Sequence, residues 1–121
     1  TNMFGDILSD LASELSGSLG LAGSINVGDN LLMAQAQHGS APDIAGKGIA
    51  NPISIISSVS MMFDWLGTKH KNLLLLKAGN YINLSINEHL KQNKYLTPDL
   101  GGNSSTKEVT SSILNIINNF E

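Results

Sequence analysis

The chain has 121 residues, of which 41% are hydrophobic and 14% are charged, and its net charge is −3. This balance is that of a globular chain, which excludes intrinsic disorder, and without a basic stripe it gives no support to nucleic-acid binding. The lack of cysteine excludes a disulfide framework and a thiolate metal site, and the longest apolar run, residues 73–76, is far too short to span a bilayer.

The first part of the chain predicts a helix followed by a hairpin. A helix is expected over residues 5–19, because apolar side chains recur there at helical spacing and glycines follow them, the apolar ones being Ile7, Leu8, Leu11 and Leu15. Short strands are expected at 24–27 and 31–37, joined by a Gly-Asp-Asn turn whose residues tolerate positive φ.

Residues 38–50 show neither the helical nor the strand periodicity of apolar residues and are rich in Gly, Ala and Ser. They therefore predict a loop whose backbone is closely approached by another group. Helices are then expected over residues 52–66 and 69–92. The first should bury Ile53, Ile56, Val59, Ser60 and Phe63 or Trp65, and the second should bury Leu73, Leu76, Leu84 and Leu90.

A glycine-rich turn is expected at 97–104. After it, Ser105 and Glu108 form the pattern of a capping box, which opens a last helix ending near Phe120. No internal repeat and no linker interrupts the chain, so residues 1–121 are expected to form a single unit.

An acidic pair on the first helix could bind a metal ion. Asp6 and Asp10 are one helical turn apart, and two carboxylates on one face repel each other unless a cation such as Mg²⁺ lies between them. Spacing alone favours the other interpretation, in which they belong to a solvated acidic face near the helix N-terminus.

The loop that begins at His38 could bind a nucleotide. Its small residues allow backbone N–H groups to face a phosphate, and Asp43 could accept hydrogen bonds from a ribose diol, as in proteins that select NAD over NADP. From residue chemistry alone, an ordinary surface loop is an equally good interpretation.

Taken together, three segments resemble the β-decarboxylating dehydrogenases of the isocitrate/isopropylmalate type. Residues 2–10 (NMFGDILSD), with 17–21, resemble that family's metal-binding stretch, and 38–52 (HGSAPDIAGKGIANP) resemble its nucleotide loop. Residues 97–102 (TPDLGG) with 105–106 resemble its C-terminal signature, and all three follow in the family's order. At the Glu-Pro that many members carry before the histidine, this chain has Gln35-Ala36.

The resemblance implies an α/β fold, of which this chain is the C-terminal part, mostly helical with a short β-hairpin. Residues 1–20 would form the metal-binding helix and 21–121 part of the nucleotide-binding large domain. It further implies that Asp6 and Asp10 hold Mg²⁺ or Mn²⁺, and that NAD is bound by His38, Gly39, Ser40, Ala41, Pro42, Asp43, Ile44 and Asn51.

The implied reaction is the NAD-dependent oxidative decarboxylation of a 2-hydroxy acid, with homoisocitrate, isocitrate and 3-isopropylmalate as candidates and a slight preference for the first two. The family's substrate-binding arginines, its catalytic tyrosine and lysine and a further metal-binding aspartate lie upstream of the matched stretch. The 121 residues are therefore expected to hold no catalytic residue and to act only within a longer enzyme.

Other interpretations remain open at this stage. The chain could be a truncated or regulatory relative that keeps nucleotide-binding or packing surfaces without turnover, or a helical interaction module. We expect it to form a homo-oligomer such as a dimer, or to associate with the missing N-terminal half, because exposing its apolar faces to water is unfavourable in free energy. A mitochondrial or cytoplasmic setting would suit the family and the lack of cysteine.

Overall fold

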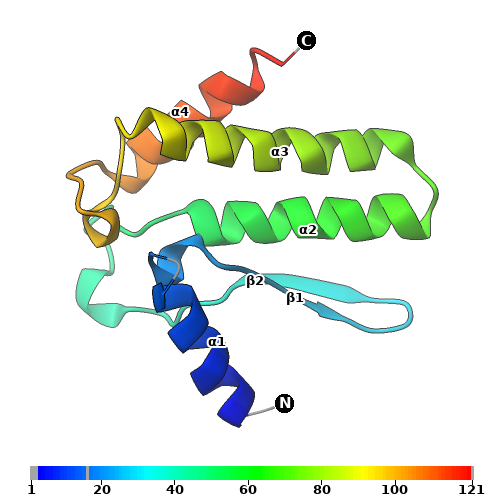
Figure 1. Cartoon of the computed structure of the whole chain (residues 1–121), viewed down its shortest axis with the longest axis horizontal. Helices are drawn as coiled ribbons and strands as arrows, with labels where there is room; N and C mark the ends of the chain where they lie inside the picture. The colour runs from blue at the N-terminus through cyan, green and yellow to red at the C-terminus, as the bar shows by residue number, and fades with distance from the viewer. Residues whose placement is uncertain (1–2, 16, 121) are drawn as a thin grey trace.

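The computed structural model describes residues 3–15 and 17–120, and it describes only the backbone of Met3 and Asp6. Four helices and one hairpin are stacked in layers (Figure 1). The main elements are α1 (Met3–Leu15), β1 (Gly23–Val27), β2 (Leu32–Ala36), α2 (Ile53–Lys69), α3 (Leu73–Gln92) and α4 (Thr106–Ile117). Three single 3₁₀ turns join them, which are η1 (Leu19–Leu21), η2 (Pro42–Ile44) and η3 (Pro98–Leu100).

Helices α2 and α3 run antiparallel and form the centre of the fold (Figure 1). Their backbones approach closely, because small residues lie between them. The hydroxyl of Ser60 donates to the carbonyl oxygen of Gly79 over 2.8 Å, and an added Cβ at Gly67 would lie 2.9 Å from the backbone nitrogen of Leu76. The reversal between the helices ends at Asn72, whose side chain accepts hydrogen bonds from the first turn of α3.

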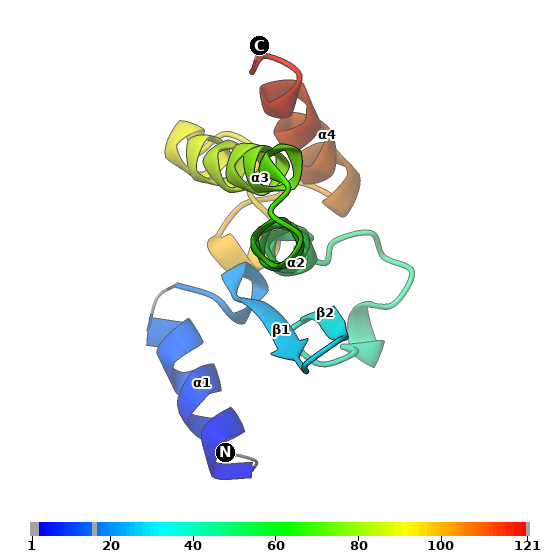
Figure 2. The same cartoon turned by 90° about the vertical axis from the view of Figure 1, so that its right-hand side faces the viewer.

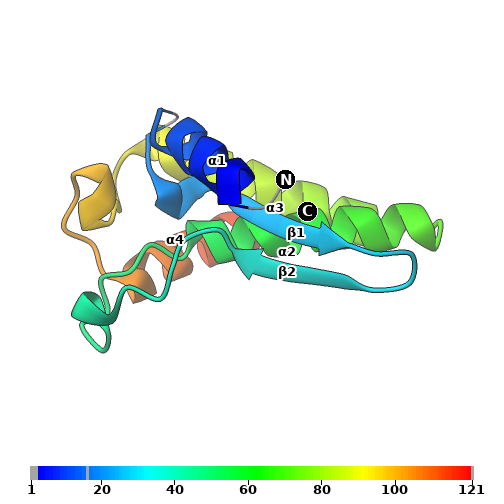
Figure 3. The same cartoon turned by 90° about the horizontal axis from the view of Figure 1, so that it is seen from below.

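The hairpin packs on the other side of α2, which therefore lies between α3 and the two strands (Figure 2). The strands pair antiparallel, with Ile25 opposite Ala34, and run along α2 (Figure 3). Two fully buried serines of α2 bind the hairpin backbone: Ser58 accepts from the N–H of Ser24 over 2.9 Å and donates to the carbonyl of Gln35 over 2.6 Å. Ser54 accepts from Gln37 N–H over 3.2 Å. These bonds fix the hairpin on α2.

The core lies where α2, α3 and α4 meet. Ile53, Ile86, Val109 and Ile113 are buried together. The imidazole of His89 is buried beside them, and its Nδ1 lies 2.9 Å from the hydroxyl oxygen of Ser112 on α4. A non-polar cluster with one hydrogen-bonded imidazole therefore holds α4 against α3.

Helix α1 stands away from the other layers in two views (Figures 1 and 2). Its apolar stripe is exposed, with Leu8 67% and Leu15 82% accessible. In the part of the chain that the structure describes, no helix is long and apolar enough to cross a membrane.

The predicted fold class is confirmed: the described chain is mostly helical with one antiparallel hairpin. Several details were wrong. Helix α1 ends at Leu15 rather than 19, and α3 starts at Leu73 rather than 69. Leu73 and Leu84, which were expected to be buried, are 78% and 43% accessible. On α3 the buried positions are instead Gly79, which α2 approaches closely, and Ser85, Ile86 and His89, of which Ile86 and His89 pack towards α4.

Candidate functional site

An open cavity of about 850 Å³ lies where the loop over residues 38–51 faces η1 and η3. Its volume is in the range of small-molecule and cofactor sites. Its walls come from segments that are far apart in the sequence. The residues that line the cavity are Glu14, Ser18, Leu19, Gly20, His38, Gly39, Ser40, Ala41, Ile44, Ala45, Gly46, Gly48, Ala50, Asn51, Asp99 and Thr106.

The loop wall is largely bare backbone. Ala41, Gly46 and Gly48 have φ values of 43°, 75° and 66°, in the left-handed region. An added Cβ at Gly46 or Gly48 would meet no atom within 4 Å. His38 is an exposed residue of the lining, with its Nδ1 2.9 Å from the carbonyl oxygen of Gly39. The wall therefore leaves room for a ligand to approach the main chain.

The structure brings most of the residues predicted to bind NAD around this cavity, namely His38, Gly39, Ser40, Ala41, Ile44 and Asn51. Pro42 and Asp43 lie outside its lining, on the exposed turn η2. Asp43 is therefore placed beside the site and not in its wall.

A carboxylate hub made by Asp99, Ser18 and Asn51 forms another wall. The Oδ2 atom of Asp99 accepts a hydrogen bond from Ser18 Oγ over 2.7 Å and one from Asn51 Nδ2 over 2.9 Å. Ser18 Oγ also accepts from Gly20 N–H over 3.0 Å, and Asn51 Oδ1 accepts from the N–H of Ile53 over 3.0 Å. The hub thus joins η1, the start of α2 and η3.

The ionisation of Asp99 reflects this surrounding. Partial burial opposes the charged form, but the hydrogen bonds from Asn51 and Ser18 and the backbone of Asp99 itself outweigh it. Together they hold the pKa of Asp99 below its ordinary value. At neutral pH the hub therefore carries a negative charge that its neighbours satisfy.

The glycines of the turn after Asp99 are required by its shape. Gly101 has φ 79°, and a Cβ on Gly102 would lie 2.0 Å from the carbonyl oxygen of Leu96. Only a residue without a side chain fits such an approach. The turn can therefore fold back tightly and present Asp99 to the cavity.

The far end of the loop is attached to α4. The N–H of Thr106 donates to the carbonyl of Gly48 over 2.8 Å, and its hydroxyl donates to the carbonyl of Ala50 over 2.5 Å. The helix itself begins with the expected capping box of Ser105 and Glu108, which is confirmed. The start of α4 therefore holds both the loop and its own first turn.

The predicted metal ligands lie on α1. Asp6 falls within the helix, but its side chain lies outside the described part of the structure. Asp10 is exposed, and its Oδ1 accepts from Nε2 of Gln37 over 3.3 Å. Gln37 also donates to Ser13 Oγ over 3.1 Å. A depression of about 330 Å³ adjoins this contact and is lined by Ser9, Asp10, Ser24, Gln35 and Gln37.

Carboxylate and amide oxygens of this kind suit a hard cation. Among residues 3–15 and 17–120, without the side chain of Asp6, no three acidic, histidine or cysteine residues gather closely enough to hold a metal ion. Of the predicted pair, the structure therefore describes only the carboxylate of Asp10, and its role as a metal ligand stays a prediction.

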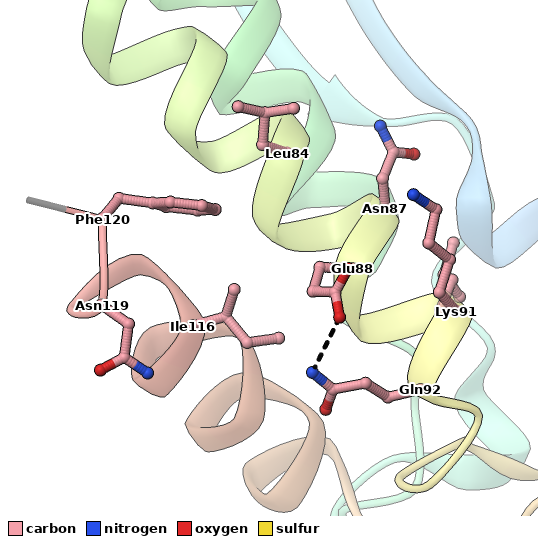
Figure 4. Close-up of a pocket in the computed structure, with 9 residues that line it drawn as sticks. Leu84, Asn87, Glu88, Lys91, Gln92, Ile116, Asn119 and Phe120 are labelled. Atoms are coloured by element: carbon pink, nitrogen blue, oxygen red, sulfur yellow. Dashed lines mark hydrogen bonds between the residues drawn. The ribbon is translucent and has the colours of Figure 1, made fainter.

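A second open concavity, of about 880 Å³, lies between α3 and the end of α4 (Figure 4). Leu84 and Phe120 contribute apolar surface, and Glu88 and Lys91 are its charged groups. The amide of Gln92 donates to Glu88 over 3.3 Å. None of its lining residues belongs to the three family-like segments, so the cavity beside the loop is the better candidate.

Ser18, Gly20, Asp99 and Thr106 were not predicted as site residues. All four lie in segments that resemble the family's motifs, and that was the available signal. Ser18 and Asp99 are 81 positions apart, however, and a single sequence does not reveal that they are bonded.

Comparison with known proteins gives a consistent result. The family model for isocitrate/isopropylmalate dehydrogenase matches residues 1–113. Homoisocitrate dehydrogenase of Methanocaldococcus jannaschii is 54% identical over 117 residues, which are 97% of this chain and 31% of that protein. The 3-isopropylmalate dehydrogenase of Sulfurisphaera tokodaii is 43% identical over 114 residues, 94% of this chain and 34% of that protein.

Among solved structures, isocitrate dehydrogenase from Methylococcus capsulatus matches with a TM-score of 0.87 and 39% identity, over 97% of this chain and 33% of that one. The chain therefore spans about a third of the length of the relatives it matches.

Proposed function

Because the chain belongs to the isocitrate/isopropylmalate dehydrogenase family, we propose that it serves in the oxidative decarboxylation of a 2-hydroxy acid, as the C-terminal part of a longer enzyme. The relatives carry the names of homoisocitrate, isocitrate and 3-isopropylmalate dehydrogenases, and one is named as NAD-dependent and mitochondrial. Those acids are the candidate substrates, and NAD with Mg²⁺ or Mn²⁺ are the proposed cofactors.

The cavity beside residues 38–51 is the proposed site for the adenosine half of NAD. The observation that carries this is the bare backbone of the loop wall, with open space beyond Gly39, Gly46 and Gly48, facing polar groups of the carboxylate hub. Flat aromatic and ribose groups can approach such a wall, and polar groups opposite fix their orientation.

Asp43 is proposed to act at the edge of this cavity. It is exposed and lies on η2, next to the lining residue Ile44. A carboxylate there would accept hydrogen bonds from the ribose hydroxyls of NAD and would repel the 2′-phosphate of NADP.

Asp10, together with Asp6 one turn before it, is proposed to bind the divalent cation. A bound Mg²⁺ or Mn²⁺ would supply a Lewis acid for the hydroxyl and carboxylate of the substrate. Gln37 holds one oxygen of Asp10 by its amide, and its backbone is held in turn by Ser54. The carboxylate is therefore restrained in position before any cation binds.

A matched pair of glycine variants tests the nucleotide site. Gly39→Leu would place a side chain at the cavity wall, where an added Cβ meets no atom within 4 Å. Gly28→Leu makes the same change in the hairpin turn, where the nearest atom is the carbonyl oxygen of Leu31 at 3.5 Å. Calorimetric titration should show that NAD and ADP-ribose bind to the unaltered chain and to Gly28→Leu and lose affinity for Gly39→Leu. Equal affinity of all three would refute this site.

A truncated or regulatory relative, which keeps nucleotide-binding or packing surfaces without turnover, is the second candidate. Production of NADH by the 121 residues alone, with Mg²⁺ and each candidate acid, would exclude that role and would also contradict our view that catalysis needs the remainder of the enzyme. Binding of NAD without turnover, restored to turnover in the longer protein, would support the first proposal.

A further inference from the structure

Resting on the proposed nucleotide site, we propose that Asp99 is a positioning residue of that site, which fixes the orientation of Asn51 and joins η1 to the loop. It acts through Asn51 and Ser18 and is not itself proposed to touch the ligand. No feature of the sequence assigns it such a role, because its partners lie 81 and 48 positions away.

The side-chain amide of Asn51 can adopt two orientations, and the structure favours one. Its Oδ1 accepts from the N–H of Ile53 at the start of α2, and its Nδ2 donates to Asp99. Reversing the amide would point its N–H groups at the N–H of Ile53 and its oxygen at a carboxylate, both of which are repulsive. Asp99 and Ile53 therefore lock the amide together.

This lock decides what Asn51 offers to a ligand. An amide nitrogen carries two N–H groups, of which one is used by Asp99, and the described residues provide no partner for the other. Asn51 is 8% accessible and lines the cavity, so it can offer its second N–H as a donor, beside the second lone pair of Oδ1. The locked amide can therefore donate to a ligand acceptor at a fixed point, such as a ring nitrogen or a ribose oxygen.

The same carboxylate also holds the opposite wall. Ser18 is buried and donates to Asp99 while it accepts from Gly20, so η1 is bound to the hub by a side chain and a backbone group. The loop has its own attachment to α4 through Thr106. Removal of the Asp99 carboxylate should therefore loosen the η1 wall and Asn51, while α4 keeps its contact with the loop.

Three variants of the full chain separate this role from a general structural one. Asp99→Ala removes the acceptor for both bonds. Asp99→Asn keeps one oxygen, which can accept both bonds, and should rescue the function. Glu88→Ala is the matched control, because it removes an exposed carboxylate that also accepts an amide N–H, over 3.3 Å, outside the cavity.

Two measurements then give independent results. Amide hydrogen exchange should become faster at residues 18–20, at Asn51 and at Ile53 in Asp99→Ala, with α3 unchanged, and should return towards normal in Asp99→Asn. Affinity for NAD should fall about tenfold in Asp99→Ala, because Asn51 loses the acceptor that orients its amide, and stay near normal in the other variants, which keep that acceptor.

Unchanged exchange in Asp99→Ala would overturn the positioning role, whether or not NAD binds. Exchange that rises equally throughout the chain would overturn it as well, because that is the effect of a general loss of stability. Failure of NAD to bind to the unaltered chain would instead refute the proposed nucleotide site, while the exchange experiment would still decide whether Asp99 holds the walls.

Discussion

Gly20 is the position at which one methyl group should disturb the carboxylate hub most. It is buried, and a Cβ there would lie 2.7 Å from Oδ2 of Asp99 and 2.9 Å from both Cβ and Nδ2 of Asn51. Non-bonded carbon atoms prefer about 3.5–4.0 Å, so the neighbours must move by most of an ångström. Both are held by hydrogen bonds, and neither can swing away freely.

The cost of Gly20→Ala follows from these contacts. Inserting a methyl group into a packed site costs about 1–3 kcal/mol, and separating Asn51 from the carboxylate costs a similar amount for a charged hydrogen bond. If Asn51 and Asp99 move apart, the steric clash is relieved but their hydrogen bond is lost. We therefore expect a loss of about 2–3 kcal/mol in the free energy of unfolding. Gly28→Ala is the control, with its nearest atom at 3.5 Å.

Urea denaturation of the two variants measures this difference directly. A second measurement follows the carboxyl carbon of Asp99 by NMR. Its pKa should rise towards the ordinary value in Gly20→Ala, because the hydrogen bonds that lower it are weakened. Equal unfolding midpoints for Gly20→Ala and Gly28→Ala, with an unchanged pKa, would refute the close packing described for the hub.

Three further predictions concern the rest of the chain. Burial lowers the pKa of His89 below its ordinary 6.5. As the pH drops through 6.5, the unfolded chain therefore takes up a proton at His89 before the folded chain does, and the free energy of unfolding should fall. Urea titrations at several pH values should show a smaller fall in His89→Gln. Ile113→Ala should lose about 2–5 kcal/mol, because the side chain is 2% accessible, whereas Leu114→Ala, 52% accessible, should change the urea midpoint little. The exposed apolar stripe of α1 should cause the 121 residues to associate with one another or with a larger assembly. Sedimentation should show smaller species when Leu8 and Leu11 are replaced by Lys. A monodisperse, cooperatively unfolding monomer of the unaltered chain would contradict this prediction.

The sequence predicts the elements of this fold better than their surroundings. Periodicity, with the turn and capping residues, located the four α-helices and the hairpin of the described chain, because these signals depend on local spacing. It also identified the apolar stripe of α1, but it says nothing about what lies against a stripe, and here Leu8 and Leu15 are exposed. Leu84 was expected to be buried for the same reason, although α2 contacts a different face of α3.

The buried serines of α2 show a second limit. Ser54 and Ser58 are completely buried, where sequence reasoning places apolar residues. They are tolerated because their hydroxyls bond to backbone groups of the hairpin, which lie 17 to 34 positions away. Such partners are set by tertiary structure, so the sequence alone could not predict them.

The candidate site was predicted as far as it is contiguous. Residues 38–51 were identified by composition and by family resemblance, and most of those named line one cavity. The opposite wall was missed because it is assembled from η1 and η3. Asp43 was included for its chemistry, and its exposure on η2 leaves its proposed contact with ribose to be tested by comparing NAD with NADP.

Gln37 gives the two proposed sites a physical connection. Its side chain donates to Asp10, its backbone N–H donates to Ser54 on α2, and the next residue, His38, lines the nucleotide cavity. A cation that attracts the carboxylate of Asp10 competes with the amide of Gln37 for that oxygen, because the amide donates to it. Binding at α1 would therefore alter the restraint on the first residue of the loop, whereas the hub and Thr106 restrain its other end. The loop is therefore held at both ends, with the proposed cation site next to one end and the proposed nucleotide site next to the other.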